Sequence, residues 1–479
     1  MKNRRLAAFA AAMLFLLPII YPQEIVPALA TSSSVLLEEN GSVRVSPGVF
    51  YKLSINLSIP SSTQYQQVQP SQEPKTDSEG NSYLPISATG PNDYFFYSRQ
   101  VAVQTSARTT PTLPATFTVP AEYAKYLQST ARTQSSDPEI RKTAQEATAG
   151  AKTPFEKIAK LAMFVNRQMV YDASYVGQQK DARFVLENRR GVCVEYSTLF
   201  IALARASGIP ARYVNGYSYS DRFQGWMGHA WAEAYVGEWV PVDPTWFEAG
   251  SLDALHIEAG KYSELSTDAT LSASVSSQYS KIKWDSGGKG GALAHNIQTL
   301  QLLSEEADGG YSLTISDASI PMNGTTTVSM TILGKDYRVM QATLLSCTGE
   351  SQVNVENSSQ YVILEPGKNA TITWKITAPE YLDSRYTYEC PLALNSPYLS
   401  HKVVSVKIDP RAGKTPAKAS DVWNAIQQAA QNGVPSPDSP QEAGAQSDGS
   451  PSIPASRPMP CLSAALVSIL AILILFAKN

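Results

Sequence analysis

Three short runs of sequence, which carry Cys193, His229 and Asp243, constrain the fold of this chain most strongly. After the cysteine, apolar residues recur at helical spacing until a Gly-Ile-Pro run, so the sequence predicts a helix that begins near Cys193. Residues 229–236 alternate like a strand, and residues 239–246 form a second short strand that contains Asp243. A helix followed by two short strands predicts an α+β core.

The three residue types suit a thiol-activating triad. A cysteine in the first turn of a helix lies at the positive end of the helix dipole, which favours thiolate over thiol. A histidine can take the thiol proton, and a carboxylate can hold the tautomer of that histidine. Each residue has an ordinary structural explanation when taken alone, because a lone cysteine is usually inert and Asp-Pro-Thr commonly ends a strand. Their shared order and flanking runs favour Cys193 as nucleophile, His229 as base and Asp243 as orienting acid.

Residues 137–257 resemble the transglutaminase-like superfamily. The resemblance rests on Gly-Val-Cys, Gly-Ile-Pro-Ala-Arg, His-Ala-Trp-Ala-Glu and Val-Asp-Pro-Thr. It implies a papain-like α+β core, the three catalytic roles given above, and no cofactor or metal ion. It does not place an oxyanion-stabilising side chain, since a Glu-Asn pair stands where papain-like enzymes often carry glutamine. The backbone N–H of Cys193 is expected to be one donor.

The turn between the two strands decides whether the histidine and the aspartate can meet. A two-residue turn at 237–238 would place His229 and Asp243 on opposite faces, because side chains alternate along a strand. A three-residue connection at 236–238, or a bulge, would bring them to one face, with Asp243 opposite Trp231. We therefore predict an odd connection or a bulge.

Alternation also puts Trp231 on the face of His229. Of the tryptophans near the triad, it is therefore the one expected to contact substrate, although tryptophans in small cores mostly pack. His256 lies close in sequence but lacks a following strand, turn and aspartate, so a structural role is expected for it.

Both ends of the chain carry targeting patterns. Residues 1–30 combine a basic start, an apolar run and an Ala-Leu-Ala cleavage site, which is typical of a secretory signal peptide. Residues 459–477 include an uncharged apolar run that predicts a single-pass transmembrane anchor, extended by a snorkelling Lys478. The alternative is a processed sorting signal that a lipid replaces. We expect an exported protein at the cell membrane, with its catalytic segment outside and protein or peptide substrates at the cell surface.

The fold class predicted is multidomain, with β domains on both sides of the α+β core. Strand patterns, helix N-caps expected at Asp137 and Thr153, and polar composition place the boundaries. The expected parts are an N-terminal β domain (31–120), the transglutaminase-like core (121–265), an extension with a flexible glycine joint (266–310), an Ig-like β-sandwich (311–409) and a disordered stalk (410–458). Six strands are expected in the sandwich, at 311–315, 325–333, 353–355, 361–364, 370–376 and 403–408.

Charge and cysteine content limit the other functions. The net charge is −3 and no Lys/Arg cluster stands out, so nucleic acid is not an expected partner. Four cysteines without a Cys-x-x-Cys pair predict neither a disulfide scaffold nor a zinc site. Export would permit a disulfide between Cys347 and Cys390, which both lie in the expected sandwich, while Cys193 stays free. Glycosylation sequons occur at Asn40, Asn56, Asn323, Asn357 and Asn369.

The best function from the sequence is thiol acyl transfer at peptide or amide bonds. Hydrolysis is favoured, because the compact core looks more like the protease-like members of the superfamily than like its large crosslinking enzymes. Two alternatives stay open. The protein is a crosslinking transglutaminase if an amine resolves the thioester, and a surface binding or scaffold protein if the core is inactive.

Overall fold

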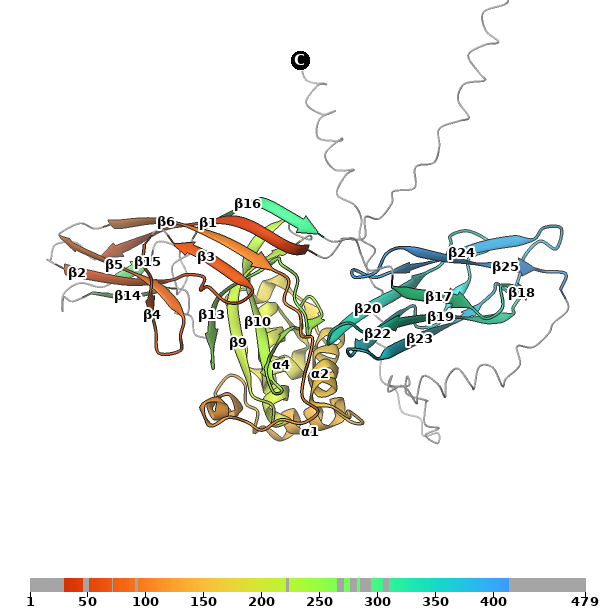
Figure 1. Cartoon of the computed structure of the whole chain (residues 1–479), viewed down its shortest axis with the longest axis horizontal. Coiled ribbons are helices and arrows are strands. Elements are labelled where there is room, and N and C mark those ends of the chain that lie inside the picture. The colour runs from red at the N-terminus through yellow and green to blue at the C-terminus, as the bar shows by residue number, and fades with distance from the viewer. Residues whose placement is uncertain are drawn as a thin grey trace, which may run out of the picture. The chain divides into compact units, whose positions relative to one another are not determined.

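The computed structural model describes residues 30–45, 51–70, 72–90, 94–220, 224–264, 271–275, 282–284, 294–304 and 310–412 (Figure 1). The predicted signal peptide up to residue 29, the glycine joint at 287–291, and the stalk and anchor beyond residue 412 lie outside the described residues. Ala30, the last residue of the predicted signal, is the first residue of strand β1. Among the residues that the structure describes, no helix combines the length and apolar character needed to cross a bilayer.

Two sheets form the N-terminal part of the chain. We predicted an extension and joint at 266–310, but this segment contains β14 (Leu271–Val275), β15 (Ile282–Trp284) and β16 (Ala294–Ser304). Strand β14 pairs with β2, and β15 and β16 pair with β1, so the segment completes these two sheets. The first sheet contains β1 (Ala30–Val45), β3 (Gln66–Pro70), β6 (Tyr94–Ser106), β15 (Ile282–Trp284) and β16 (Ala294–Ser304). The second contains β2 (Tyr51–Ser58), β4 (Lys75–Thr76), β5 (Ser82–Gly90) and β14 (Leu271–Val275).

The helices of the core begin at the caps that the sequence indicates. Asp137 accepts hydrogen bonds from the backbone of Glu139 and Ile140, and Thr153 accepts one from Glu156. Helix α4 begins at Cys193, as its spacing predicted, and ends before Gly208, whose φ of +75° suits a helix stop. The helical elements are η1 (Ala121–Leu127), α1 (Pro138–Ala147), α2 (Pro154–Gln168), η2 (Ala173–Tyr175), α3 (Ala182–Asn188) and α4 (Cys193–Ala206).

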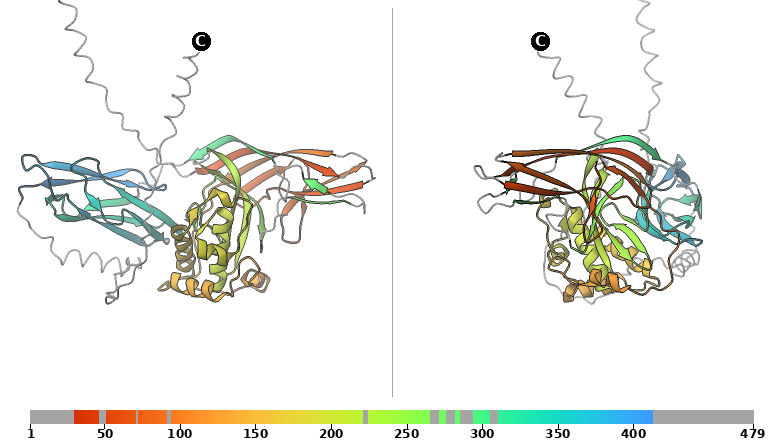
Figure 2. Two further views of the ribbon diagram at one scale, coloured as in Figure 1. Left: turned by 180° about the vertical axis from the view of Figure 1, so that it is seen from behind. Right: turned by 60° about the vertical axis from the view of Figure 1, so that its left-hand side comes forward.

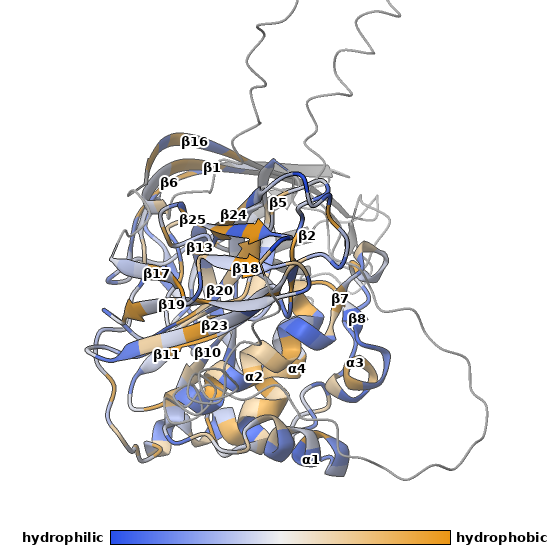
Figure 3. Cartoon of the chain, turned by 90° about the vertical axis from the view of Figure 1, so that its right-hand side faces the viewer, coloured by the Kyte–Doolittle hydropathy of each residue, from blue (hydrophilic) through white to orange (hydrophobic). Residues whose placement is uncertain are grey.

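The core sheet packs against α4 (Figure 2). Its strands follow the order β13-β9-β10-β11-β12. Ala230, Ala232 and Ala234 are buried with the apolar residues of α2 and α4, which carry much of the apolar colour in Figure 3. The strands are β9 (Ala211–Ser220), β10 (Gly225–Tyr235), β11 (Trp239–Asp243), β12 (Glu248–Ala249) and β13 (His256–Tyr262), and a separate parallel pair joins β7 (Val170–Tyr171) to β8 (Arg190–Gly191).

Residues 311–409 form two sheets around a second apolar core that includes Trp374. The structure contains a strand at each of the six predicted positions. It also contains three further strands, β18 (Ser319–Pro321), β20 (Arg338–Leu345) and β24 (Tyr388–Asn395). One sheet contains β17 (Tyr311–Ile315), β19 (Thr325–Leu333), β21 (Asn354–Val355) and β23 (Asn369–Thr377). The strands β18 (Ser319–Pro321), β20 (Arg338–Leu345), β22 (Ser359–Leu364), β24 (Tyr388–Asn395) and β25 (Lys402–Asp409) join the core sheet through the pairing of β12 with β20. The more specific Ig-like assignment stays a prediction.

The structure links Cys347 to Cys390 by a disulfide with a Cα–Cα distance of 5.3 Å, the pairing that the sequence predicted. The side chains of Asn56, Asn323, Asn357 and Asn369 are exposed. Asn40 lies in β1, and its side chain is outside the described ones. Glycosylation stays a prediction.

Candidate active site

Cys193 is the first residue of α4 and is 9% exposed. Its backbone N–H points out of the helix start, because the first N–H groups of a helix have no intrahelical acceptor. The helix dipole therefore acts on the thiol, and the backbone N–H is available to an oxyanion.

Glu195 fixes the backbone before the nucleophile. It is fully buried and accepts hydrogen bonds from the backbone N–H of Val192 at 3.0 Å and of Lys180 at 2.9 Å. Gly191 is required beside it, because a Cβ there would lie 2.3 Å from the Cβ of Glu195. Glu195 was not predicted from the sequence. It stands at the glutamate position of a capping box, but the N-cap residue is Val192, which has no side-chain oxygen to complete the signal.

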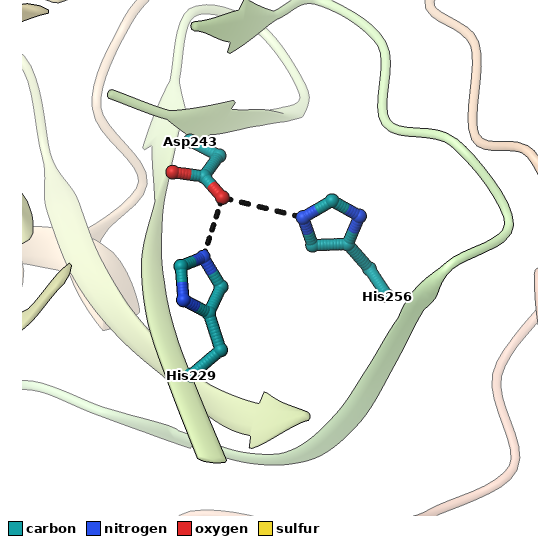
Figure 4. A group of neighbouring side chains, drawn as sticks. All are labelled: His229, Asp243 and His256. Atoms are coloured by element: carbon teal, nitrogen blue, oxygen red, sulfur yellow. Dashed lines mark hydrogen bonds and ion pairs between the residues drawn. The ribbon is translucent and has the colours of Figure 1, made fainter. Parts of the chain in front are cut away.

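The hairpin that carries the other two residues has the odd connection that we predicted. Strands β10 and β11 pair with Tyr235 opposite Trp239 and Ala232 opposite Val242, which leaves three residues, 236–238, in the loop. His229 and Asp243 therefore share one face of the sheet. Their side chains meet, with Nε2 of His229 2.6 Å from Oδ2 of Asp243 (Figure 4).

The Asp243 carboxylate is fully buried and held by four donors. Its Oδ1 accepts the backbone N–H groups of Thr245 at 2.7 Å and Trp246 at 3.2 Å. Its Oδ2 contacts Nε2 of both His229 and His256. Burial opposes ionisation, yet the two histidines hold the pKa of Asp243 well below its usual range. The carboxylate is therefore ionised and fixed in orientation.

His229 interacts with the Cys193 thiol as well as with this carboxylate. Burial disfavours the protonated ring, but Asp243 and Cys193 outweigh burial and raise the pKa of His229 to about 9. Because Nε2 donates to Asp243, Nδ1 is the atom left to exchange a proton with Cys193. This arrangement can stabilise a thiolate and imidazolium pair.

Two tryptophans flank the His229 ring. Trp246 is half-buried and stacks on His229, with ring centroids 5.4 Å apart, and its Nε1 donates to Ser218. Trp231 lies on the face of His229, as alternation predicted, but it is 2% exposed and packs with Val214 and Leu252. This burial does not support the substrate contact that we predicted for Trp231. The more exposed Trp246 is better placed than Trp231 for contact with a substrate.

His256, for which we expected a structural role, contacts the candidate triad directly. Its Nε2 lies 3.2 Å from Oδ2 of Asp243 (Figure 4). Its Nδ1 lies 2.9 Å from Oδ1 of Asp253. Burial alone would lower its pKa, but the hydrogen bonds to Asp243 and Asp253 raise the pKa of His256 well above its ordinary value. No sequence signal pointed to this contact, because it depends on the pairing of β13 with β9.

Two groups of described side chains bring potential metal ligands together. They are His229, Asp243 and His256, and Glu248, Asp253 and His256, each with ligand atoms within 4.8 Å. In both groups imidazole nitrogens face carboxylate oxygens at hydrogen-bonding distance. A cation would have to displace the protons that these bonds require. The described geometry fits a hydrogen-bonded network better than a metal centre.

Part of the chain matches a known family. Residues 141–244 match the model of the transglutaminase-like superfamily. An uncharacterised protein of Mycobacterium leprae is 30% identical over 99 residues, which cover 19% of this chain and 35% of the relative. An uncharacterised protein of Bacillus subtilis is 32% identical over 88 residues, which cover 15% of this chain and 11% of the relative. The chain thus spans less than half of either relative.

Solved structures include similar chains at low identity. The crystal structure of a "putative cysteine protease" from Cytophaga hutchinsonii has 18% identity and a TM-score of 0.44, covering 58% of this chain and 94% of that one. The periplasmic domain of TgpA from Pseudomonas aeruginosa has 18% identity and a TM-score of 0.26, covering 46% of this chain and 91% of that one. On the family match, residues 141–244 of this chain belong to the transglutaminase-like superfamily.

Proposed function

We propose that the protein is a thiol enzyme that cleaves peptide or amide bonds through Cys193, His229 and Asp243. One observation carries the proposal. The buried His229 ring donates from Nε2 to Asp243 at 2.6 Å and is close enough to Cys193, at the start of α4, for the sulfur to raise its pKa.

The reaction has two halves, formation of a thioester on Cys193 and hydrolysis of that thioester. The Cys193 sulfur attacks the carbonyl carbon after its proton passes to Nδ1 of His229. The oxyanion faces the backbone N–H of Cys193, and Asp243 stabilises the imidazolium. His229 then returns the proton to the leaving amine, which departs and leaves a thioester on Cys193. Water, deprotonated by His229, cleaves the thioester and regenerates the thiol.

Hydrolysis is preferred over amine transfer because it requires no second specific site. A crosslinking enzyme must hold an amine at the thioester and keep water scarce. Trp246 is the aromatic side chain best placed to border such an acceptor path, and it is only half-buried. Amine transfer is therefore the second candidate.

One assay distinguishes hydrolysis from amine transfer. The full-length protein is incubated with a glutamine-containing protein and a labelled primary amine. We expect cleavage or ammonia release with little incorporation of label, and loss of both in Cys193→Ala. Cys461→Ala is the matched control, since it removes the other cysteine outside the disulfide. Efficient incorporation without cleavage would decide for crosslinking.

A non-enzymatic scaffold is the remaining class. A covalent thiol probe should label the Cys461→Ala protein at Cys193 at neutral pH, because a thiolate is the reactive form. A Cys193 thiol that reacts no faster than an unperturbed cysteine would favour the scaffold.

We also propose that the described part of the chain lies outside the cell, anchored through residues 459–477, and acts on surface proteins. Protease added to intact cells should then release a soluble, active fragment. Protection of the catalytic segment from that protease would contradict this location.

A further inference from the structure

His256 is a titratable side chain that contacts the candidate triad and has no part in the reaction above. It comes from β13, the far edge strand of the core sheet, and reaches the Asp243 oxygen that also binds His229. The two imidazole rings lie 5.9 Å apart between centroids. Asp243 thus bridges two histidines through a single oxygen atom.

We propose that His256 is a positioning residue of the triad, whose imidazolium fixes the Asp243 carboxylate and opposes tight proton binding at His229. The inference rests on the proposed function, since it assigns a role within that triad. Two features of the geometry support it, namely the acceptors on both ring nitrogens and the shared oxygen.

The acceptors on both nitrogens require the doubly protonated ring. Nδ1 faces the Asp253 carboxylate at 2.9 Å, and Nε2 faces the Asp243 carboxylate at 3.2 Å. Glu248 lies farther from Nδ1, at 3.9 Å, and burial raises the pKa of Glu248 to about 8. A neutral imidazole has one N–H and could donate to only one of these carboxylates. His256 is buried, so the uncompensated carboxylates would be costly without its charge.

Other charged groups line a cavity beside His256. The cavity has a volume of about 310 Å³ and is lined by His256 and Trp231, but not by Cys193 or His229. Its other charged lining residues are Arg108, Arg212, Lys261, Glu233, Glu238, Glu258 and Asp253, the partner of Nδ1. The three cations form ion pairs with Glu233, and Lys261 also pairs with Glu258. The direct hydrogen-bond partners of His256 are the carboxylates of Asp243 and Asp253.

The shared oxygen makes His256 a competitor of His229. A positive ring at this distance disfavours a proton on His229 by electrostatic repulsion, and its hydrogen bond draws electron density from Oδ2 of Asp243. Without His256, the imidazolium of His229 would be held more tightly and would return its proton to the leaving amine more slowly. The second histidine therefore tunes the base as well as orienting its partner.

The test measures the titration of His229 directly. The full chain, which has four histidines, is labelled with ¹⁵N-histidine and titrated by NMR as wild type and as His256→Gln. Glutamine keeps an amide donor near Asp243 and removes the charge. We expect the titration midpoint of His229 to rise by roughly one pH unit. His401→Gln, which changes an exposed histidine, is the matched control and should leave His229 unchanged.

A second variant guards against misfolding of the first. Asp253→Asn keeps an acceptor for Nδ1 but removes the charge that favours the imidazolium, so the His229 midpoint should rise by less than in His256→Gln. An unchanged His229 titration in both folded variants would overturn the inference. The proposed function has a separate test. It would be contradicted if Cys193 of the wild type showed no enhanced reactivity with iodoacetamide, and the effect of His256 on the titration of His229 could still be measured in that case.

Discussion

The ring of Phe247 packs edge-on against that of Tyr361, with centroids 4.3 Å apart. The first residue follows Asp243 by four positions and the second belongs to β22 of the C-terminal sheets. Tyr361 also donates to Asn166 and lies under the guanidinium of Arg167, at 4.1 Å from its ring centroid. The loop that follows Asp243 therefore packs against β22 of the C-terminal sheets.

Asp243→Asn should lower kcat/KM by roughly 10²–10⁴-fold. It should also lower the melting temperature, because it removes the charge that His229 and His256 share in the buried site. The asparagine oxygen can still accept from the backbone of Thr245 and Trp246, but its NH₂ would face Nε2 of His229. His229 would then carry its proton on Nδ1 and could not accept one from Cys193. Steady-state kinetics and a thermal melt measure the two effects. An asparagine variant of near wild-type activity would contradict the orienting role.

Trp246→Ala should reduce activity about tenfold, whereas Trp246→Phe should retain most of it. Phenylalanine preserves the stacking on His229 and loses only the hydrogen bond to Ser218. The comparison of kcat with KM in both variants shows whether the ring positions His229 or contacts substrate. Equal activities for the alanine and phenylalanine variants would exclude a stacking role.

Stability should fall as the pH rises through about 9. His229 has a folded pKa raised from 6.5 to about 9, so its contribution is fully present below pH 6.5 and is lost as the pH passes 9. The lowered pKa of Asp243 acts in the other direction, and its contribution is lost only in strong acid. Urea unfolding at pH 6 and pH 9.5 should show a smaller pH effect in His229→Gln than in His401→Gln. An equal change in unfolding free energy between the two pH values in both variants would contradict the pairing of His229 with Asp243.

Gly237→Ala should destabilise the protein more than Gly208→Ala. Both glycines have positive φ, +107° and +75°, which costs about 1 kcal/mol for alanine. At Gly237 a Cβ would also lie 2.2 Å from Cγ of Pro114, whereas at Gly208 nothing lies within 4 Å. Overpacking adds roughly 1–3 kcal/mol to the loss in free energy of unfolding at position 237. Urea titrations compare the two variants, and equal losses would show that Pro114 can move aside.

Replacing Cys347 and Cys390 by alanine together should destabilise the C-terminal sheets by about 4 kcal/mol in the chain-entropy model, given a sequence separation of 43. The disulfide lies outside the candidate triad, so thiol labelling of Cys193 should persist below the new melting temperature. Calorimetry of the variant against the wild type measures the loss. An unchanged melting profile would show that packing alone holds this domain.

Local patterns predicted much of the core. The cap at Asp137, the cap at Thr153 and the start of α4 follow from side chains next to them in the sequence. The three-residue hairpin loop followed from the alternation of strands, because only an odd connection lets His229 reach Asp243.

Contacts between distant segments were beyond the same patterns. Pro391 lies inside β24 and weakens its strand signal, although the strand pairs regularly with β25. The strands at 271–304 were not assigned to the N-terminal sheets, because their partners lie more than two hundred residues earlier. His256 reaches Asp243 only once β13 has paired with β9.

The pairing of Ala249 with Val339 has a consequence for anyone who cuts the gene into fragments. A polypeptide limited to 141–244 would keep the three proposed catalytic side chains and lose β12, β13 and the partner strand β20. Strands β9 and β11 would then present bare backbone edges, which pair readily with other chains. Such a fragment should precipitate or oligomerise, and the smallest well-behaved piece should extend past β25.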